Sequence, residues 1–507
     1  MFKGHPKGLI PASLANMGER FGFYTMMAIL VLFLQAKFGL SGTNAGYIYA
    51  AFYFSIYILS LVGGIIADRI KNYKGTILVG LVLMAFGYVI MAIPTPTPVS
   101  NVPLFLSISI VGLFVIAFGN GLFKGNLQAL VGQMYDNEKF GAKRDSGFSL
   151  FYAFINVGAI FAPFTAVGIR NWWLKSHGYT YDASLPEQCH TYLGGSMTAD
   201  NATKFDEYAA AASDIPVTDL TAFSNDYLNV FNTGFHYAFG IAIIAMIIST
   251  VIYLMNRKKF PDPQGVKTAT GEITKEVKME AKEVAQRMYA LLAVFGVVIF
   301  FWFSFHQNGL TLTFFARDYT VLQFGSWNFA AEIFQSMNPF FVVFLTPIIV
   351  ALFGWLHARG IEPSTPKKIA IGMGIASSAF VLMMIGSFGL PLLAEISPRL
   401  GGTPLVDSEK VTPFLLLGTY FILTVAELFI SPMGISFVSK VSPPQYQGLM
   451  QGGWLGATAL GNGLLFIGAI LYDSIPIWMT WGIFVITTAI SMLTILFMIK
   501  WLERVAK

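Results

Sequence analysis

The chain has 507 residues, of which 55% are hydrophobic and only 12% are charged. Soluble proteins carry about 25% charged residues, so this composition argues against a soluble enzyme, a secreted disulfide scaffold, a disordered protein and a nucleic-acid binder. The net charge is +5, and the single cysteine, Cys189, excludes an internal disulfide and argues against a cysteine-based metal site. The apolar surplus indicates a protein that lies in a lipid bilayer.

Twelve apolar segments are long enough to cross a bilayer. The hydrocarbon core needs about 20 apolar residues in a helix, and backbone that contacts lipid has to be helical. In chain order the segments are 13–36, 44–67, 75–94, 103–131, 147–169, 232–255, 289–314, 330–355, 368–389, 411–437, 448–472 and 476–500. The first contains Glu19 and Arg20 and is followed by no cleavage site, so we expect it to be retained rather than removed as a signal peptide.

The basic residues predict the orientation of these segments. If the N-terminus is cytoplasmic, the cytoplasmic connections hold 23 Lys and Arg residues and the outer connections hold seven. The seven are Lys37, Arg170, Lys175, Lys204, Arg317, Arg399 and Lys410. Cytoplasmic loops are enriched in Lys and Arg, so we expect both termini in the cytoplasm and a multi-pass protein of the cell membrane, with the bacterial inner membrane favoured by the short outer loops.

Two long polar stretches divide the chain. Residues 170–231 form an acidic outer loop, for which a solvated cap is a simpler interpretation than a binding domain. Residues 256–288 form a cytoplasmic linker that separates an N-terminal six-helix half (1–255) from a C-terminal half (289–507). Apolar residues recur in this linker at helical spacing and predict an amphipathic helix on the membrane surface: Ile273, Val277, Ala281, Val284 and Met288.

The two halves share a short pattern. Residues 64–69 and 354–359 both read G-x-x-x-x-R, after the second segment of each half. Two six-helix halves in parallel repeat are the plan of major facilitator transporters, in which the substrate site lies near the membrane midplane between the halves. The expected fold is therefore an all-α membrane protein with twelve transmembrane helices in two halves.

Few charged residues interrupt the apolar segments. Glu19 and Arg20 lie in the first, Lys124 in the fourth and Glu427 in the tenth, and His306 lies in the seventh. A charge at mid-membrane costs roughly 2.5–3.5 kcal/mol. An internal salt bridge that only holds helices together is one interpretation, but apolar residues would do this without the desolvation penalty. Cations in one half and a carboxylate in the other instead suit a zwitterionic ligand such as a short peptide or an amino acid.

His306 has two interpretations that the sequence does not separate. A single membrane histidine can be a hydrogen-bonded packing residue, or it can exchange protons near neutral pH because its unperturbed pKa is about 6.5. Enzyme function is not expected, because no H-E-x-x-H, phosphate-binding loop or G-x-S-x-G pattern occurs in a usable context. No cofactor and no metal are expected.

Six motifs in chain order resemble one family. Residues 148–159 read FSLFYAFINVGA, which fits the fifth-helix F-x-x-x-Y-x-x-I-N-x-G pattern of the proton-dependent oligopeptide transporters, a branch of the major facilitator superfamily. The other five are ERFGFY at 19–24, GGIIADR at 63–69, GNGLFKGN at 119–126, QSMNP at 335–339 and ELFISP at 427–432. Gly125 stands where the family pattern has proline. The resemblance covers nearly the whole chain.

The resemblance implies a role for each matching residue. Arg20 and Lys124 are implied to bind the carboxylate of a peptide, and Glu427 its amino terminus. Asn156 and Asn338 are implied to contact the peptide backbone, with interhelical hydrogen bonding as the alternative.

The same resemblance implies side-chain pockets and a gate. Tyr24, Tyr57 and Trp454 are implied to line side-chain pockets, although core packing explains Tyr57 and Trp454 equally well. Asp68 and Arg69 are implied to belong to the inner gate.

Three positions depart from the family pattern. Asn16 replaces a glutamate of the first-helix motif, Met27 replaces a basic residue, and His306 stands where the family has an acidic residue before Gln307. The resemblance associates both lost carboxylates with proton coupling, and asparagine cannot carry a proton in the same way.

These observations predict a monomeric secondary transporter that moves di- and tripeptides with protons by alternating access. The candidates for the proton site are Glu19, His306 and Glu427. The alternatives are a proton-independent facilitator, exchanger or exporter of another organic solute on the same fold, and a membrane receptor that does not transport. Small peptides, protons and the lipid bilayer are the expected partners, and nucleic acid is not.

Overall fold

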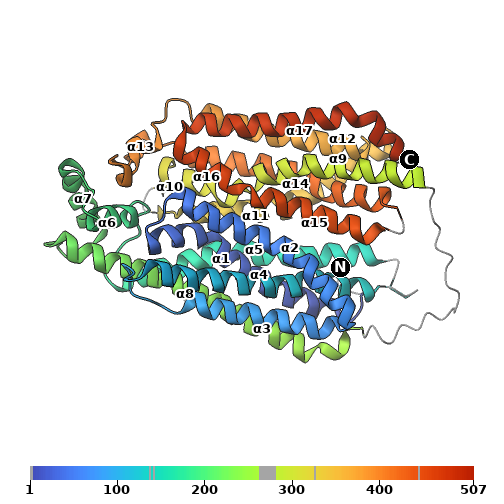
Figure 1. The fold of residues 1–507 in the computed structure, drawn as a ribbon, viewed down its shortest axis with the longest axis horizontal. Helices are drawn as coiled ribbons and strands as arrows, with labels where there is room; N and C mark the ends of the chain where they lie inside the picture. The colour runs from blue at the N-terminus through green and yellow to red at the C-terminus, as the bar shows by residue number, and fades with distance from the viewer. Residues whose placement is uncertain are drawn as a thin grey trace.

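The structure, a computed structural model, describes residues 4–135, 139–140, 143–261, 281–324, 327–443 and 446–506. Long helices run side by side through the molecule (Figure 1). Twelve helical segments among the described residues are long and apolar enough to cross a membrane. Each overlaps one of the twelve predicted segments, which confirms the predicted all-helical architecture.

Six of these segments form the N-terminal half. They are α1 (Leu9–Phe38), α2 (Gly42–Ile70), α3 (Tyr73–Ala92), α4 (Val102–Gln133), α5 (Arg144–Ser176) and α8 (Leu220–Met255), which is followed by η2 (Arg257–Lys259). Two shorter helices, α6 (Leu185–Leu193) and α7 (Ala199–Ala212), lie between α5 and α8 in the chain.

The other six form the C-terminal half. They are α9 (Ala281–Phe305) with η4 (His306–Gly309) and α10 (Thr311–Tyr319), η5 (Ala331–Ser336) with α11 (Met337–Ala358), α12 (Thr365–Gly386), α14 (Pro413–Val441), α15 (Gln447–Gly463) with α16 (Leu465–Ser474), and α17 (Ile477–Val505). The connections contain β1 (Gln323–Phe324), β2 (Trp327–Asn328), α13 (Leu393–Ile396), η6 (Pro398–Leu400) and η7 (Asp407–Glu409).

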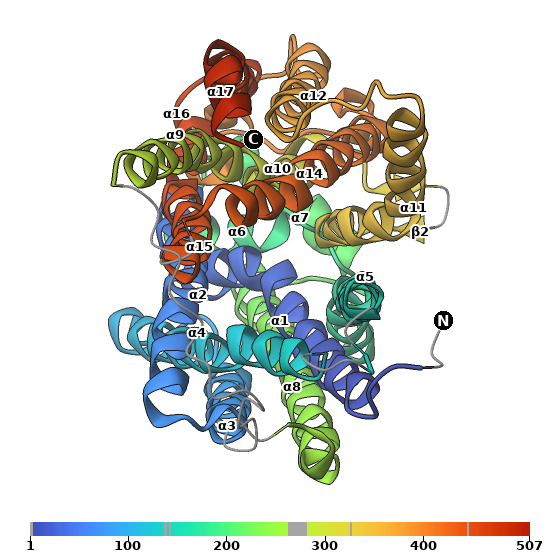
Figure 2. The same ribbon diagram turned by 90° about the vertical axis from the view of Figure 1, so that its right-hand side faces the viewer.

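The two halves lie beside each other, as the view along the helices shows (Figure 2). Helices α6, α7 and α13 gather at one end of the molecule, and both chain ends lie toward the opposite end (Figure 1). We call these the α6–α7 end and the terminal end. α1 starts at the terminal end, and η5–α11 runs toward it. The position of a residue along its helix therefore gives its distance from each end.

Small residues allow close helix contacts within the N-terminal half. A Cβ atom on Gly63 of α2 would lie 2.1 Å from the carbonyl oxygen of Gly121 on α4, and one on Gly121 would lie 2.5 Å from that of Leu59. Membrane helices associate through packing and not through exclusion of water, so backbone approach at small residues is a main source of their stability. The α2–α4 contact positions Tyr57 and Lys124 relative to each other.

The two polar stretches have different outcomes. Residues 262–280 of the predicted linker, with Ile273 and Val277 of the proposed amphipathic helix, lie outside the described residues; residues 281–288 begin α9. In the acidic stretch 170–231, the predicted boundaries were wrong at both edges, because α5 continues to Ser176 and α8 starts at Leu220. The stretch also contains α6 and α7, which the sequence did not predict.

Candidate functional site

The first helix brings a carboxylate and a guanidinium together. Nε and Nη2 of Arg20 donate to the two carboxylate oxygens of Glu19 at 2.5 and 2.8 Å. Asn120 on α4 donates from Nδ2 to Oε1 of Glu19 at 2.6 Å. Glu19 is completely buried and Arg20 nearly so. Glu19 is therefore neutralised inside its own half, by its chain neighbour.

Lys124 on α4 is a half-buried cation that makes no ion pair with a described residue. Its Nζ lies 4.4 Å from the ring centroid of Tyr57, a cation–π contact. No described carboxylate lies within 4 Å of this ammonium group. Glu19 is near enough to attract Lys124 through space, but Arg20 lies close by and repels it. The ammonium group is thus available to a ligand.

Glu427 on α14 is the matching group in the C-terminal half. Its Oε2 accepts a hydrogen bond of 2.8 Å from Nδ2 of Asn338 on α11, and the same amide donates to Oγ1 of Thr424 at 3.1 Å. Both Glu427 and Asn338 keep partial exposure. Glu427 makes no ion pair with any residue that the structure describes.

Tyrosines lie between the cations of the N-terminal half and Glu427 of the C-terminal half. Tyr24 and Tyr57 belong to the N-terminal half, yet each lies close enough to both Arg20 and Glu427 to interact with them electrostatically. Tyr53, one helical turn before Tyr57, packs its ring 4.8 Å from that of His306 in the C-terminal half. The cations Arg20 and Lys124 and the anion Glu427 therefore face a common region.

His306 lies in η4, where the seventh span departs from regular α-helix. Its Nδ1 is 2.5 Å from Oδ1 of Asn462, and its ring stacks on Trp302 at 4.8 Å. The side chain is 6% exposed. This environment of one amide and several rings is that of a packed, hydrogen-bonded histidine, and it also places the ring at the contact between the halves.

The remaining motif residues make contacts within their own half or lie at a helix end. Nδ2 of Asn156 donates to the carbonyl of Tyr152 in its own helix at 3.1 Å. Trp454 is buried against Gly434, where an added Cβ would lie 1.9 Å from its ring. Arg69 is exposed at the end of α2, and the side chain of Asp68, its predicted gate partner, lies outside the described residues.

One pair of charges was missed by the sequence analysis. Arg170 was assigned to an outer loop, but it lies inside α5, is completely buried, and pairs with the equally buried Glu332 of η5. The sequence did contain a signal, because Glu332 falls inside the apolar segment 330–355. An uncommon intramembrane carboxylate implies a buried partner.

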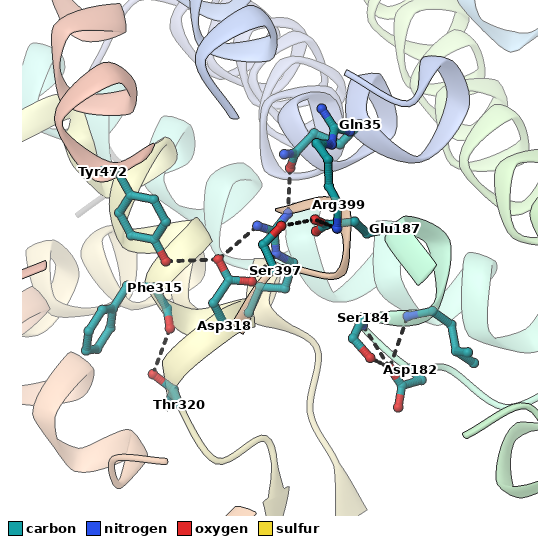
Figure 3. A network of polar contacts seen from close by, with 12 residues as sticks. Gln35, Asp182, Ser184, Glu187, Phe315, Asp318, Thr320, Ser397, Arg399 and Tyr472 are labelled. Carbon is teal, nitrogen blue, oxygen red and sulfur yellow. Dashed lines mark hydrogen bonds and ion pairs between the residues drawn. The ribbon is translucent and has the colours of Figure 1, made fainter. Parts of the chain in front are cut away.

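Hydrogen bonds join the two halves at the α6–α7 end (Figure 3). Arg317 of α10 donates to Oε1 of Gln35 on α1 at 2.6 Å. Arg399 donates to the carbonyl of Gly39 at 2.6 Å, and Ser397 contacts Glu187 of α6. Two cavities of about 220 and 390 Å³ remain between these side chains.

The halves are therefore closed at the α6–α7 end. Between described residues, every hydrogen bond from one half to the other lies nearer to the α6–α7 end than Tyr24 and Asn338 do. The one farthest from that end runs from Gln335 to the carbonyl of Ala28. The Arg20–Lys124–Glu427 region lies beyond these contacts, toward the terminal end. No group of three or more His, Cys, Asp or Glu suited to a metal occurs in the described part of the chain.

The chain is similar along most of its length to proteins named as transporters. A peptide transporter of Yersinia enterocolitica is 27% identical over 91% of this chain and 87% of its own length. Dipeptide and tripeptide permease A of Escherichia coli is 24% identical over 90% of this chain and 82% of its own. An uncharacterised transporter of Bacillus subtilis, YclF, is 27% identical over 95% and 91% of the two chains.

Solved structures show the same fold. A peptide transporter POT in complex with sulfate superimposes with a TM-score of 0.73 at 22% identity, covering 100% of this chain and 96% of the other. A POT family transporter in complex with 5-aminolevulinic acid gives 0.71 at 20% identity, covering 100% and 98%. The sequence model of the POT family matches residues 74–277 and 266–480. The chain belongs to the POT family.

Proposed function

We propose that this protein is a secondary transporter of di- and tripeptides that works by alternating access. The observation that carries the proposal is the division of charge: Arg20 and Lys124 lie in one half and Glu427 in the other, around one region. A dipeptide zwitterion has a carboxylate and an ammonium group at its two ends. The relatives named as peptide permeases support the same substrate class.

The unpaired state of two of these groups supports binding rather than helix locking. A structural ion pair would have joined Lys124 and Glu427 to protein partners, yet their closest contacts are the Tyr57 ring and the Asn338 amide. Charges kept in the membrane without ion pairs cost free energy. A zwitterionic ligand bound between the halves would offset this cost, because its carboxylate pairs with Lys124 and its ammonium group with Glu427. Such a ligand would draw the halves toward each other.

Proton coupling is part of the proposal, with Glu19 as the first candidate. Arg20 neutralises Glu19 through two hydrogen bonds. When a peptide carboxylate competes for Arg20, Glu19 loses part of its counter-charge and gains affinity for a proton. Glu427 and His306 remain the other candidates, since both lie at the same interface between the halves.

We further propose a multi-pass monomer in the cell membrane with the terminal end in the cytoplasm. The excess of Lys and Arg in the connections at that end supports this orientation. The closed α6–α7 end then faces outward.

Labelled dialanine uptake into proteoliposomes tests the proposal, with and without an inward proton gradient. The wild-type protein should accumulate dialanine when the gradient is imposed. Glu427→Gln should lose most of this uptake, while Glu409→Gln, which changes an exposed carboxylate at the α6–α7 end, should retain it. N-acetyl-dialanine, which lacks the ammonium group, should compete poorly with the wild-type substrate.

Other outcomes identify the alternatives. Dialanine equilibration that ignores the gradient would indicate a facilitator or exchanger, and binding without uptake would indicate a receptor. Full uptake by Glu427→Gln would remove the proposed ammonium site.

A further inference from the structure

The buried ion pair between Arg170 and Glu332 joins the two halves of the molecule. Arg170 lies on α5 and Glu332 on η5, 162 residues apart in sequence. Nη1 of Arg170 contacts Oε1 of Glu332, and both side chains are completely shielded from solvent. Any motion that separates the halves at the α6–α7 end has to break this pair.

The two partners differ in what holds them when the pair is broken. Arg170 has further contacts inside its own half, because Nε and Nη2 both donate to Oδ1 of Asn171 at 3.1 Å. Its guanidinium also lies over the rings of Tyr181 at 4.0 Å, Phe235 at 5.3 Å and Phe231 at 5.4 Å. These contacts move together with Arg170.

Glu332 has no such support. Its Oε1 contacts Arg170, while its Oε2 is buried and has no hydrogen-bond partner among the residues that the structure describes. Separation of the halves would therefore leave a carboxylate without its cation and with one oxygen already unsatisfied. An uncompensated buried charge costs several kcal/mol, and a carboxylate avoids this cost by taking up a proton.

The other charged groups around Glu332 are already engaged. η5 packs against α5, α1, α10 and α11. On α10, Arg317 and Asp318 pair with each other at 2.6 Å. Tyr181, which follows α5, interacts with both Glu332 and Arg170.

The charged groups on the other two helices are occupied or distant. On α1, the outermost cation, Lys37, donates hydrogen bonds to Thr95 and Thr97. On α11, the titratable His357 lies at the far end of the helix. Arg170 is thus the counter-charge that decides the state of Glu332.

We propose that Glu332 is a proton-binding positioning residue that couples opening of the α6–α7 end to proton uptake. The inference rests on the proposed transport function. It assigns part of the coupling to a residue outside the peptide-binding region, in a chain where Asn16 and His306 replace two acidic residues of the family pattern.

The coupled cycle has a defined proton balance. As the α6–α7 end opens, Glu332 leaves Arg170 and takes one proton from the solution at that end. As the end closes again, Arg170 returns and displaces the proton from the carboxyl group. The contacts of Arg317 with Gln35 and of Arg399 with Gly39 have then re-formed. Coupling requires that the released proton leave toward the terminal end, along with the peptide.

Transport by Glu332→Gln in proteoliposomes tests this role. Glutamine keeps the shape of the side chain and mimics the protonated carboxyl. Gradient-driven accumulation of dialanine should fall to equilibration, while exchange of internal for external dialanine should continue. Glu332→Asp should restore accumulation in part. Glu187→Gln, which also alters an acid at the contact between the halves, should keep gradient-driven accumulation.

A second measurement does not depend on transport. Ala36 is a buried position that lines the cavity between the halves. In a Cys189→Ser background, Ala36→Cys reports opening by its rate of reaction with a water-soluble thiol reagent. Only the thiolate form of a cysteine reacts, so the labelling rate is divided at each pH by the rate of the same cysteine in unfolded protein. One linked proton changes the open fraction by up to about tenfold per pH unit, so this relative labelling rate should rise as pH falls when Glu332 is present. In Glu332→Gln the relative labelling rate should be high and independent of pH.

The outcomes separate the two proposals. Absence of uptake by the wild-type protein contradicts the transport function, whatever the labelling shows. Wild-type accumulation that persists in Glu332→Gln, or a relative labelling rate that keeps its pH dependence in that variant, overturns the role of Glu332. If Glu332→Gln fails to fold, a pH-independent relative labelling rate in the protein that retains Glu332 overturns it equally.

Discussion

At the scale of single residues, Lys124 is the proposed ligand-binding cation whose surroundings are most informative. Its ammonium group rests on the face of Tyr57 instead of a carboxylate. A cation–π contact stabilises the charge by about 0.5–2 kcal/mol, and a hydrogen bond to a ligand carboxylate would contribute about 1.5–3 kcal/mol. We therefore expect Tyr57 to hold Lys124 in place while a substrate carboxylate can still bind it.

Replacement of Lys124 should weaken substrate binding strongly. Hydrogen bonds to charged groups contribute about 1.5–3 kcal/mol, so Lys124→Gln should raise the Kd for dialanine by about 10- to 150-fold. Lys367→Gln, an exposed lysine paired with Glu503, is the matched control and should leave Kd unchanged. Titration of purified protein by calorimetry or by thermal shift measures both. Equal affinity of Lys124→Gln and wild type would place the carboxylate elsewhere.

Glu362, between α11 and α12, should give a pH-dependent contribution to stability. Hydrogen bonds from Lys368 and then His357 hold the pKa of the Glu362 carboxyl below its usual value. A lowered pKa in the folded state means that the stabilisation is complete above the unfolded-state pKa and is lost as pH falls through the folded-state pKa. Unfolding of Glu362→Gln in detergent should show a deficit of at most about 1 kcal/mol near neutral pH.

This deficit should disappear in acid. Once the pH has fallen below the lowered pKa of Glu362 in the folded state, the wild-type carboxyl is neutral like the glutamine amide, and the two proteins should unfold at the same temperature. A deficit that stayed constant down to that pH would mean that the amide disturbs packing rather than removing a charge.

The residue scale is also where the sequence was most and least informative. Short motifs made Arg20, Lys124 and Glu427 candidates, because rare charges in apolar segments are visible without any structure. Arg170 was misassigned because it follows an apolar segment directly, and its partner Glu332 is 162 residues away. Periodicity within a single helix carries no information about such a pairing.

At the scale of elements, the contact of α2 with α4 should depend on one glycine and not on its neighbour. A Cβ at Gly63 would lie 2.1 Å from the backbone of α4, whereas a Cβ at Gly64 meets nothing within 4 Å. Because backbone cannot move aside cheaply, Gly63→Val should lower the unfolding temperature and the yield of folded protein. Gly64→Val should change neither by a comparable amount.

Thermal unfolding and size-exclusion profiles in one detergent measure this difference. Similar behaviour of the two variants would contradict close α2–α4 packing at Gly63. Uptake by folded Gly63→Val should also fall, since the shift moves Tyr57 relative to Lys124.

The twelve spans could be predicted from the sequence because each is a single apolar run that lipid forces into a helix. Their ends were less predictable, because α5 and α8 extend beyond the apolar segments to Ser176 and from Leu220. Helices α6 and α7 were not predicted, since contacts with the other half support them: Asn201 of α7 donates to the carbonyls of Gly401 and Gly402. Such short helices depend on tertiary packing more than on their own propensity.

At the scale of the whole molecule, the two ends of the interface between the halves differ. Hydrogen bonds and a buried ion pair connect the halves at the α6–α7 end. The acidic stretch between α5 and α8 takes part, because Glu187 and Asn201 both contact the C-terminal half. It was predicted to be a solvated cap, and it also contributes to the contacts between the halves at that end.

A cross-link at this end should therefore stop transport. In a Cys189→Ser background, Glu187→Cys with Ser397→Cys should react with a short bifunctional thiol reagent, and dialanine uptake should stop while substrate binding from the terminal end continues. Each single cysteine variant treated with the reagent is the control and should remain active. With a cleavable reagent, reduction should restore uptake. Undiminished transport by the cross-linked protein would show that α6 need not part from the C-terminal half.

The uneven distribution of these contacts also has a consequence for measured affinities. If the end with more contacts is closed for most of the time, a substrate arriving there meets a receptive molecule only in the rare open state. Its apparent dissociation constant is the intrinsic one divided by the open fraction. Half-saturation on the α6–α7 side should then need more peptide than on the terminal side, even though the proposed binding residues are the same for both. Without an imposed gradient, the maximal rate divided by the half-saturation concentration has to be equal in the two directions. Entry and exit should then be symmetric at low peptide concentrations and differ only near saturation.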